Sequence, residues 1–252
     1  MDEQWEYFLC TIGEFAASIF VDVSAINHLA SCPGNLVQLR VIYKNPREDG
    51  LPTKAEFAAV RDLEDSIQEA IGSDDRYVGR RTFNKQRQFY IYSAFDEAHW
   101  RSFAAKLADR SGYIIRVDYQ EDPAHAGYTE DLYPSIDDWQ VIEDLRVIER
   151  LRSEGDDGST SRPIDHWAYF PSEDSARSFA SWAKSQGFTE LRESSHATDR
   201  GDYQVRLTHE GTVKIREIGN KTIALNRAAR DHGGNYDGWE TPILRTENPA
   251  DK

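Results

Sequence analysis

The sequence predicts an α+β protein made of two ferredoxin-like (βαββαβ) sandwich domains. Alternating apolar and polar residues mark short strands, and apolar residues three or four positions apart mark helices. Both halves of the chain repeat the order strand, helix, strand, strand, helix, strand, which is typical of an antiparallel sheet with helices on one face. At 252 residues the chain is long enough for two such domains.

The first domain is expected at residues 1–134. Residues 5–11 and 16–23 predict an extra amino-terminal β-hairpin around a turn that contains Gly13. Val37, Leu39 and Val41 alternate with polar residues, as in a half-buried strand. The six elements of this domain are expected as strand 37–43, helix 54–71, strands 77–83 and 88–93, helix 96–110, and a last strand over 113–119.

A connecting segment is expected at residues 135–161. Ser135 is a suitable N-cap, and Asp137 and Asp138 fall in the first turn, where the helix dipole favours negative charge. This helix should run to about Ser153 and bury an apolar stripe against a neighbouring domain. The polar, glycine-rich residues 154–161 that follow predict a flexible linker.

The second domain is expected at residues 162–252. Its elements are strand 165–170, helix 173–186, strands 188–193 and 202–208, helix 212–232 and strand 236–244. Gly233 and Gly234 are expected to supply the left-handed residues that end the last helix.

Composition narrows the possible functions. A formal net charge of -14 repels phosphate backbones, so direct nucleic-acid binding is not expected, and it favours docking on a basic protein surface. Solubility alone would also explain the charge. Cys10 and Cys32 lack the spacing of a disulfide framework or a thiolate metal site. With no signal-like start and no apolar run of about 18 residues, a cytoplasmic protein away from membranes is expected.

Motifs for catalysis or cofactor binding are missing from the sequence. It contains no glycine-rich phosphate loop, no HExxH and no GxSxG, so neither catalytic residues nor a cofactor are predicted. His166, His196, His209 and His232 fall in the second domain and could meet in space, but without ligand spacing no metal site is predicted. The many paired acids follow from an acidic composition and are expected on solvated surfaces.

One face of the second sheet should be free of helices. If Ala168 and Phe170 pack beneath the helices, Trp167 and Tyr169 reach the opposite face, joined by Arg206. RNA-recognition domains stack bases on such aromatics. Here the RNP1-like sequence is missing and the charge is unfavourable, so contact with a protein partner or with another domain fits better.

Three segments resemble a known family. The sequences PIDHWAYF (163–170), Gly187-Phe188 and GGNYDGWET (233–241) resemble the regulator of ribonuclease E activity B domain, over about residues 162–244. Residues 1–134, with WEY (5–7) and DLYP (131–134), resemble the bacterial domain of unknown function 695. The resemblance implies an α+β sandwich and a non-catalytic regulator that binds ribonuclease E and inhibits its RNA cleavage.

We therefore predict a protein-binding regulator whose partner is ribonuclease E or a related RNA-processing nuclease with a basic segment. A Trp anchor beside an acidic group suits a partner that bears Arg. The predicted partner-binding residues are Trp167, Tyr169, Arg206, Asp237 and Trp239. Two alternatives stay open: an enzyme of unrecognised type with a site between the two domains, and a small-ligand sensor that encloses an effector there.

Overall fold

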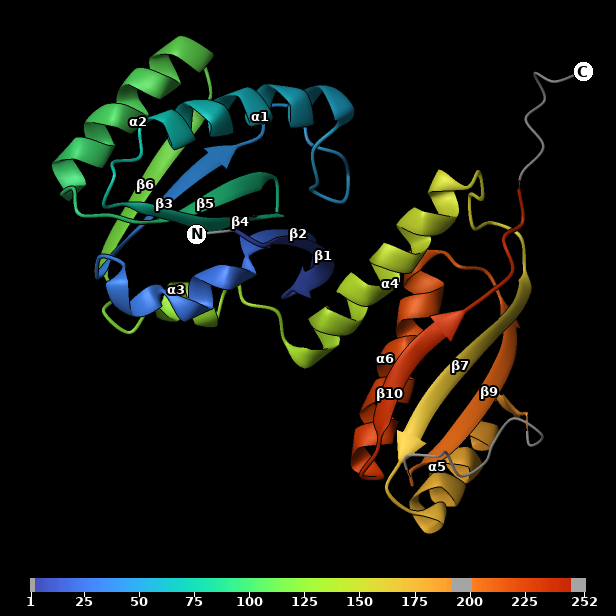
Figure 1. Ribbon diagram of the computed structural model, residues 1–252. Coiled ribbons are helices and arrows are strands. Elements are labelled where there is room, and N and C mark those ends of the chain that lie inside the picture. The colour runs from blue at the N-terminus through green and yellow to red at the C-terminus, as the bar shows by residue number, and fades with distance from the viewer. Residues whose placement is uncertain (1–2, 192–200, 246–252) are drawn as a thin grey trace, which may run out of the picture. The chain divides into compact units, whose positions relative to one another are not determined.

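The computed structural model describes residues 3–191 and 201–245, and the chain divides into two compact units, residues 1–135 and 136–252. Each unit combines one antiparallel sheet with helices (Figure 1). The predicted α+β class and the two ferredoxin-like domains are confirmed. Each unit is described by itself below.

The amino-terminal unit contains a six-stranded sheet in the order β1-β2-β4-β5-β3-β6. Its elements are β1 (Trp5–Ile12), β2 (Phe15–Asp22), β3 (Asn35–Ile42), α1 (Lys54–Glu69), β4 (Arg76–Phe83), β5 (Gln86–Tyr92), α2 (Glu97–Ser111), β6 (Ile114–Glu121) and α3 (Ala126–Thr129), with the 3₁₀ helices Val23–Asn27 and Leu29–Ser31. Strands β4, β5, β3 and β6 have the ferredoxin-like order, and the predicted hairpin β1–β2 extends the sheet beyond β4.

Both faces of this sheet are covered. Helices α1 and α2 lie on one face, where Val37, Phe89, Ile91 and Trp100 form a core (Figure 1). On the other face lies the short α3, whose Tyr128 hydroxyl donates to the Asp22 carbonyl over 2.8 Å. Helix α3 and the 3₁₀ helices were not predicted, because segments of three to five residues are too short to show apolar periodicity.

The carboxy-terminal unit contains a four-stranded sheet in the order β10-β7-β9-β8, the ferredoxin-like order again. Its elements are α4 (Ile136–Ser153), β7 (Arg162–Phe170), α5 (Glu173–Ser185), β8 (Thr189–Glu190), β9 (Tyr203–Gly211), α6 (Ile215–Asp231) and β10 (Asn235–Glu240). The strand predicted at 188–193 is thus observed as two residues, and the end of that range lies outside the described residues.

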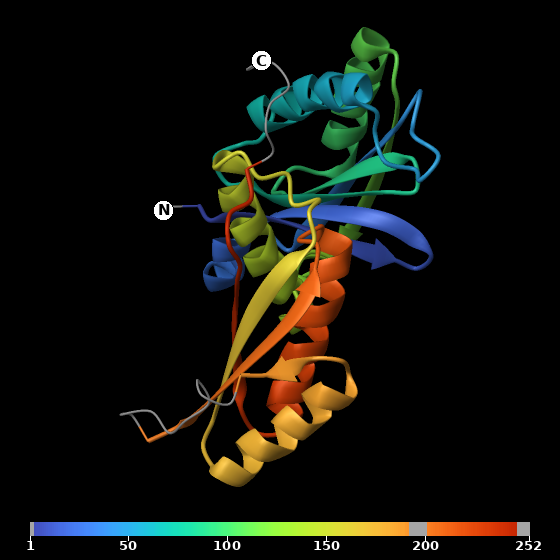
Figure 2. The same cartoon turned by 90° about the vertical axis from the view of Figure 1, so that its right-hand side faces the viewer.

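Helices α5 and α6 cover one face of this second sheet (Figure 2). Their core contains Phe170, Phe179, Val205, Leu225 and Tyr236. Of these residues, Phe170 is the one that the sequence alternation placed beneath the helices. The opposite sheet face carries the remaining residues of each strand.

Helix α4, which the sequence assigned to a connecting segment, lies alongside α6 within the second unit. The Thr222 hydroxyl donates to Asp144 over 2.5 Å, and the Asn226 amide donates to Gln140 over 3.1 Å. Ile148 of α4 packs with Trp239 in a second, smaller core.

Residues 154–161, expected to be flexible, are tied to β7. The Asp156 side chain is fully buried and its carboxylate forms an ion pair with Arg162, whose Nη2 lies 2.9 Å from Asp156 Oδ1. The composition of this segment predicted a linker, because glycines and polar residues are typical of linkers. Composition does not show that Asp156 forms a buried ion pair with Arg162.

Candidate functional site

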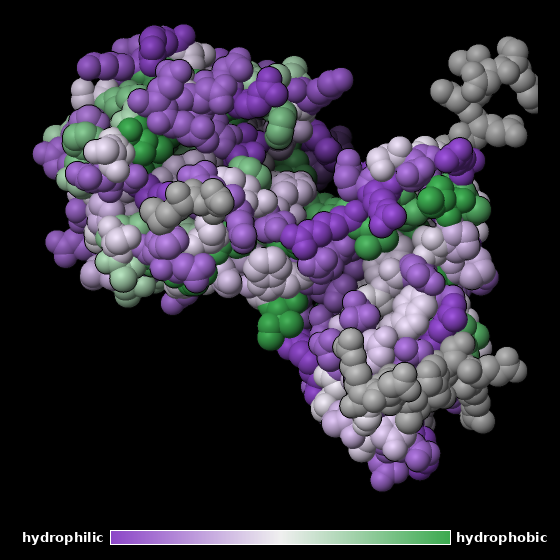
Figure 3. Space-filling model, viewed as in Figure 1, coloured by the Kyte–Doolittle hydropathy of each residue, from purple (hydrophilic) through white to green (hydrophobic). Residues whose placement is uncertain are grey.

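The face of the second sheet opposite α5 and α6 carries three of the predicted partner-binding residues. Ala168 and Phe170 are each 1% exposed against the helices, whereas Trp167 and Tyr169 are half-buried on the opposite face. The register places Trp167 opposite Arg206 of β9. Figure 3, which views this face, shows residues of intermediate hydropathy among hydrophilic ones over β7 and β10.

Arg206 holds Trp167 in position on this face, and Gln204 contacts Tyr169. Its Nη2 donates to Asp165 over 2.7 Å, and its guanidinium carbon lies 5.0 Å from the centre of the Trp167 ring system. The Tyr169 hydroxyl donates to Gln204 over 3.2 Å. Because Asp165 neutralises Arg206, this pair adds no net charge to the surface.

Strand β10 forms one edge of the sheet and contains a β-bulge. Tyr236 pairs with Ala168, and Gly238 pairs with Trp167, so Asp237 is an extra residue in the strand. Bulges at sheet edges change the direction of side chains and discourage edge-to-edge pairing. Asp237 is exposed there.

Trp239 lies on the other side of the sheet from Trp167. Its side chain is only 7% exposed and packs with Ile148 of α4 and Ile164 of β7. The indole Nε1 donates to Asp144 Oδ1 over 2.8 Å. Trp239 therefore belongs to the core and offers no exposed anchor to a partner.

Asp144, which the sequence analysis placed with the other paired acids on a solvated surface, is instead buried and connects α4 to α6 and β10. The carboxylate is fully buried and accepts hydrogen bonds from Trp239, Thr222 and Gln140. Burial raises its pKa, and the three hydrogen bonds act in the opposite direction. A signal was present in the sequence, because Asp144 falls within the apolar stripe of Val141 and Ile148, where an acid needs partners.

A hollow of about 490 Å³ lies between α4 and the β10 edge of the sheet. We call it the acidic groove, and it is lined by Gln140, Glu143, Asp144, Val147, Trp167, Tyr169, Tyr236, Asp237, Gly238, Trp239 and Glu240. Four of these residues carry carboxylates, and the lining among the described residues includes no Lys, Arg or His. Carboxylates beside aromatic rings suit a cationic side chain.

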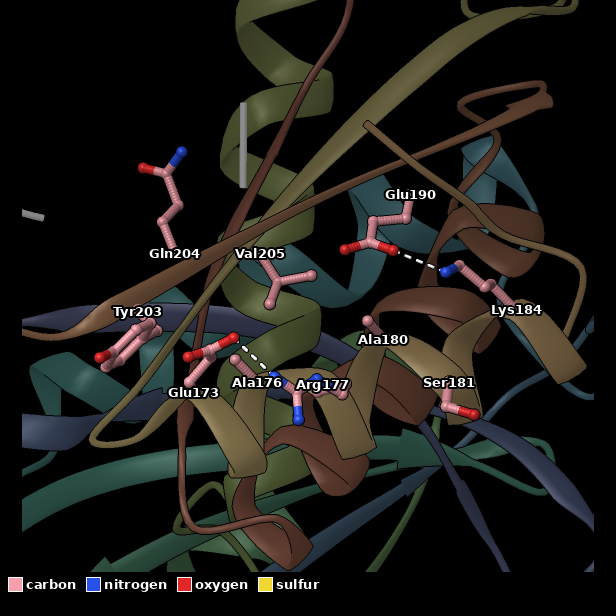
Figure 4. Close-up of a pocket in the computed structure, with 10 residues that line it drawn as sticks. All are labelled: Glu173, Ala176, Arg177, Ala180, Ser181, Lys184, Glu190, Tyr203, Gln204 and Val205. Carbon is pink, nitrogen blue, oxygen red and sulfur yellow. Dashed lines mark hydrogen bonds and ion pairs between the residues drawn. The ribbon is translucent and has the colours of Figure 1, made fainter. Parts of the chain in front are cut away.

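A second hollow, of about 450 Å³, lies between α5 and β9 (Figure 4). Its charged groups pair with one another: Arg177 Nη2 lies 2.6 Å from Glu173 Oε1, and Lys184 Nζ lies 2.6 Å from Glu190 Oε2. Because these charges are already balanced, we place the candidate site at the acidic groove.

Two of the four histidines noted in the sequence meet in the core. His166 Nε2 lies 2.9 Å from His209 Nδ1, His232 Nδ1 lies 2.7 Å from the Ala228 carbonyl, and His196 lies outside the described residues. Within residues 3–191 and 201–245, no group of three His, Cys, Asp or Glu side chains is placed to hold a metal ion. No helix in the same ranges is long and apolar enough to cross a membrane.

The two glycines before β10 have different roles, which corrects the expectation that both are left-handed. Gly233 has φ +75°, and a Cβ there would meet nothing within 4 Å. Gly234 lacks a positive φ, but a Cβ there would lie 2.2 Å from Phe170 Cδ1 and 2.5 Å from the Tyr169 carbonyl oxygen. Gly233 thus supplies backbone conformation, and Gly234 supplies space.

Gly234→Ala is expected to lower the free energy of unfolding by about 2–3 kcal/mol, because the added methyl group overpacks against Phe170. Gly233→Asn is the matched control and should cost less than about 1 kcal/mol, since Asn tolerates the left-handed conformation. Urea denaturation of both variants measures the difference. Equal losses would contradict the distinction between the two glycines.

The fold and the groove define a two-domain α+β protein with an acidic groove in its second unit. Residues 3–133 match a family of unknown function, DUF695, over just over half of the chain, and the chain belongs to this family. Residues 141–241 match the family described as regulator of ribonuclease activity B. The predicted resemblance and its arrangement are confirmed, and the second match supports a regulatory role. No curated protein matches the chain.

The second match covers nearly all of the acidic groove. It begins at residue 141, within α4, rather than at residue 162, where the sequence resemblance was drawn. Among the residues that line the groove, only Gln140 falls outside it. The part of the chain that matches a regulator family therefore includes most of α4.

Proposed function

We propose that the protein is a non-catalytic regulator that binds ribonuclease E or a related RNA-processing nuclease and inhibits it. The acidic groove receives a basic segment of the nuclease. The observation that carries this proposal is the lining of the groove, with four carboxylates, two half-buried aromatic side chains and no basic residue among the described residues. The match to regulators of ribonuclease activity supports the choice of partner.

The groove provides two kinds of contact for Arg or Lys. Asp237 and Glu240 are exposed carboxylates that can accept charge-assisted hydrogen bonds, whereas the exposed Glu143 already forms an ion pair with Arg146. Trp167 and Tyr169 provide aromatic surface for the aliphatic stems and for cation–π contact. The formal net charge of -14 adds a long-range attraction that speeds encounter with a basic segment.

The predicted site residues divide between direct contact and support. Trp167, Tyr169 and Asp237 contact the partner. Arg206 positions Trp167 through its ion pair with Asp165, and Trp239 positions β10 through its hydrogen bond to Asp144. Inhibition follows when the bound segment is no longer available for the nuclease's contacts with RNA or with its scaffold, so it is stoichiometric and involves no turnover.

Reversing the charge of the groove tests this proposal. The double substitution Asp237→Lys, Glu240→Lys is expected to weaken binding to the purified nuclease at least about tenfold, because two attractive pairs become repulsive. The melting temperature should stay within about 2 °C of the wild type, since both side chains are exposed. Isothermal titration calorimetry and thermal denaturation measure the two quantities.

Glu149→Lys on α4 is the matched control, because Glu149 is exposed and does not line the groove. The groove variant reverses two charges, so Glu149→Lys is combined with a second reversal of an exposed acid outside the groove. If this double control weakens binding as much as the groove variant does, the partner is attracted by net charge and not by the groove. An RNA-cleavage assay tests inhibition separately: activity should fall until the regulator equals the nuclease in concentration. A pull-down with this protein from native cytoplasm that recovers no ribonuclease or RNA-decay component would contradict the proposal.

A further inference from the structure

The amino-terminal unit contains a cationic hollow of about 180 Å³ on the side of the sheet that faces α1. Strands β1, β2, β4 and β5, α1, and the loop at residues 46–52 contribute to its lining. Polar groups in the lining include Tyr7, Ser18, Arg47, Arg80, Thr82 and Arg87. Three guanidinium groups thus line one small hollow in a chain whose formal net charge is -14.

The buried charges around this hollow do not balance. Arg80 and Arg87 share one carboxylate, that of Glu64: Arg80 hydrogen-bonds to Glu64 Oε1, and Arg87 Nη1 lies 3.5 Å from Glu64 Oε2. The Tyr77 hydroxyl also donates to Oε1, over 2.9 Å. One carboxylate facing two guanidiniums leaves one positive charge, and Arg47, paired with exposed Asp49, lies in the loop above them.

Arg87 has a buried Nη1 donor without a hydrogen bond of ordinary geometry among the described residues, although the Tyr43 hydroxyl lies near enough for an interaction with this side chain. The residue is 2% exposed, and its Nε donates to the Thr82 hydroxyl over 3.2 Å. Its Nη1 is buried and makes no hydrogen bond to any described residue, beyond the longer ion pair with Glu64. A buried charged donor without a hydrogen-bond partner is unfavourable, and proteins retain such groups where they serve a ligand.

A purely structural role accounts for only part of this arrangement. The guanidinium carbon of Arg80 lies 4.3 Å from the centre of the Phe20 ring, and that of Arg87 lies 5.2 Å from the Phe57 ring. Stacking on aromatic rings fixes each guanidinium and leaves its N–H edges available. Glu64 neutralises one of the two charges. The second charge and the Arg87 Nη1 donor are what a bound anion would satisfy.

We propose that this hollow binds a small anion of the phosphate class, either free phosphate or a phosphate monoester. Guanidinium and hydroxyl donors from four strands and a loop surround it from several directions, which suits a tetrahedral oxyanion better than a planar carboxylate. The volume of about 180 Å³ restricts the ligand to a small one. None of the residues that line this hollow belongs to the acidic groove.

Calorimetry and thermal denaturation of the full-length protein test the proposal with sodium phosphate, phenyl phosphate and sodium acetate, each against sodium chloride of equal ionic strength. Phosphate or phenyl phosphate should bind and raise the melting temperature, and acetate should not. Tighter binding of phenyl phosphate assigns the site to a monoester, and tighter binding of inorganic phosphate assigns it to the free ion. The proposal is overturned if acetate raises the melting temperature as much as phosphate does. It is also overturned if none of the three anions raises it.

Substitutions locate the site. Arg47→Gln changes an exposed side chain and should weaken phosphate binding about tenfold without loss of folding. Arg87→Met removes the buried guanidinium and should abolish binding. Arg101→Gln on α2 is the matched control, an exposed arginine outside the hollow that pairs with Glu97. If Arg101→Gln weakens binding as much as Arg47→Gln does, the phosphate is not held in this hollow.

Discussion

Replacing Arg162 with methionine is expected to lower the free energy of unfolding of the carboxy-terminal unit by about 3–5 kcal/mol, the usual loss when one partner of a buried ion pair is removed. Arg162 is 2% exposed, and it also donates to the carbonyls of Thr160 and Pro242, over 3.0 and 3.1 Å. Without the guanidinium, the buried Asp156 carboxylate loses its opposite charge and keeps the hydrogen bonds from the backbone N–H groups of Gly158 and Leu244, and both carbonyls lose this donor. Urea denaturation at pH 7 measures the loss.

The pH dependence of stability gives a second measure of the same pair. Hydrogen bonds from Arg162 are the main reason why the pKa of Asp156 is lowered from 3.8 to about 2. A lowered pKa in the folded state means that the unfolded chain takes up the proton first as the pH falls. The stabilisation is therefore present above about pH 4 and is lost as the pH falls towards 2.

Two variants separate this ion pair from a general effect of losing an arginine. Arg177→Met removes an exposed arginine that pairs with Glu173 on α5, and should cost less than about 0.5 kcal/mol. The double variant Asp156→Asn, Arg162→Met should be more stable than Arg162→Met alone, because it removes the uncompensated charge. A double variant less stable than the single one would contradict this explanation.

The sequence predicted most of the fold because the strands follow period-two alternation closely. In β7, Ala168 and Phe170 face the helices and Trp167 and Tyr169 the other side, as the alternation requires. Helix α4 was predicted as an element, but its packing against α6 was not. That packing depends on Asp144, and two of its three hydrogen-bond partners lie 78 and 95 residues away in the sequence. Periodicity carries no information about contacts at such separations.

Trp239 shows why alternation failed at one position of the candidate site. Counted with period two, Trp239 shares a face with Asp237 and lies opposite Tyr236. The bulge inserts Asp237 as an extra residue, so that Tyr236 and Trp239 both face the helices. The sequence feature that indicates the bulge is Asp237-Gly238. Glycine suits a bulge because it adopts positive φ values, and Gly238 has φ +137°. Prediction of the site therefore depended on a local backbone irregularity that the sequence indicates only weakly.

The buried pair His166 and His209 should make the protein markedly less stable in mild acid. Both pKa values are lowered from 6.5, mainly by burial, to about 3 for His166 and about 4 for His209. At neutral pH both rings are therefore uncharged in the folded protein, and the 2.9 Å contact between His166 Nε2 and His209 Nδ1 holds a single proton between the two nitrogens. Tyr236, whose hydroxyl lies 2.8 Å from His166 Nδ1, completes the chain of hydrogen bonds.

The direction of the pH effect follows from these lowered values. Between about pH 6.5 and 4 the unfolded chain binds two protons that the folded chain does not, so stability falls as the pH falls through this range. The expected loss between pH 6.5 and 4.5 is about 3–5 kcal/mol. Carboxylates contribute to acid sensitivity as well, so the comparison needs a variant without the histidines.

The double variant His166→Gln, His209→Gln keeps polar side chains at both positions but cannot take up the two protons. The slope of the free energy of unfolding against pH reports how many more protons the unfolded chain binds than the folded one. Urea denaturation at pH 6.5, 5.5 and 4.5 should show that this number is smaller in the variant than in the wild type by about two. Asp156 does not contribute to this difference, because it is present in both proteins, and its ordinary pKa of 3.8 and its lowered pKa of about 2 both lie below the range measured. Equal slopes would mean that the histidines accept protons within the folded core. In that case the core must tolerate two adjacent imidazolium rings with Lys221 nearby, whose charge already lowers both pKa values. Burial beside this third positive charge makes that outcome unfavourable, and the acid-sensitive core is the expected result.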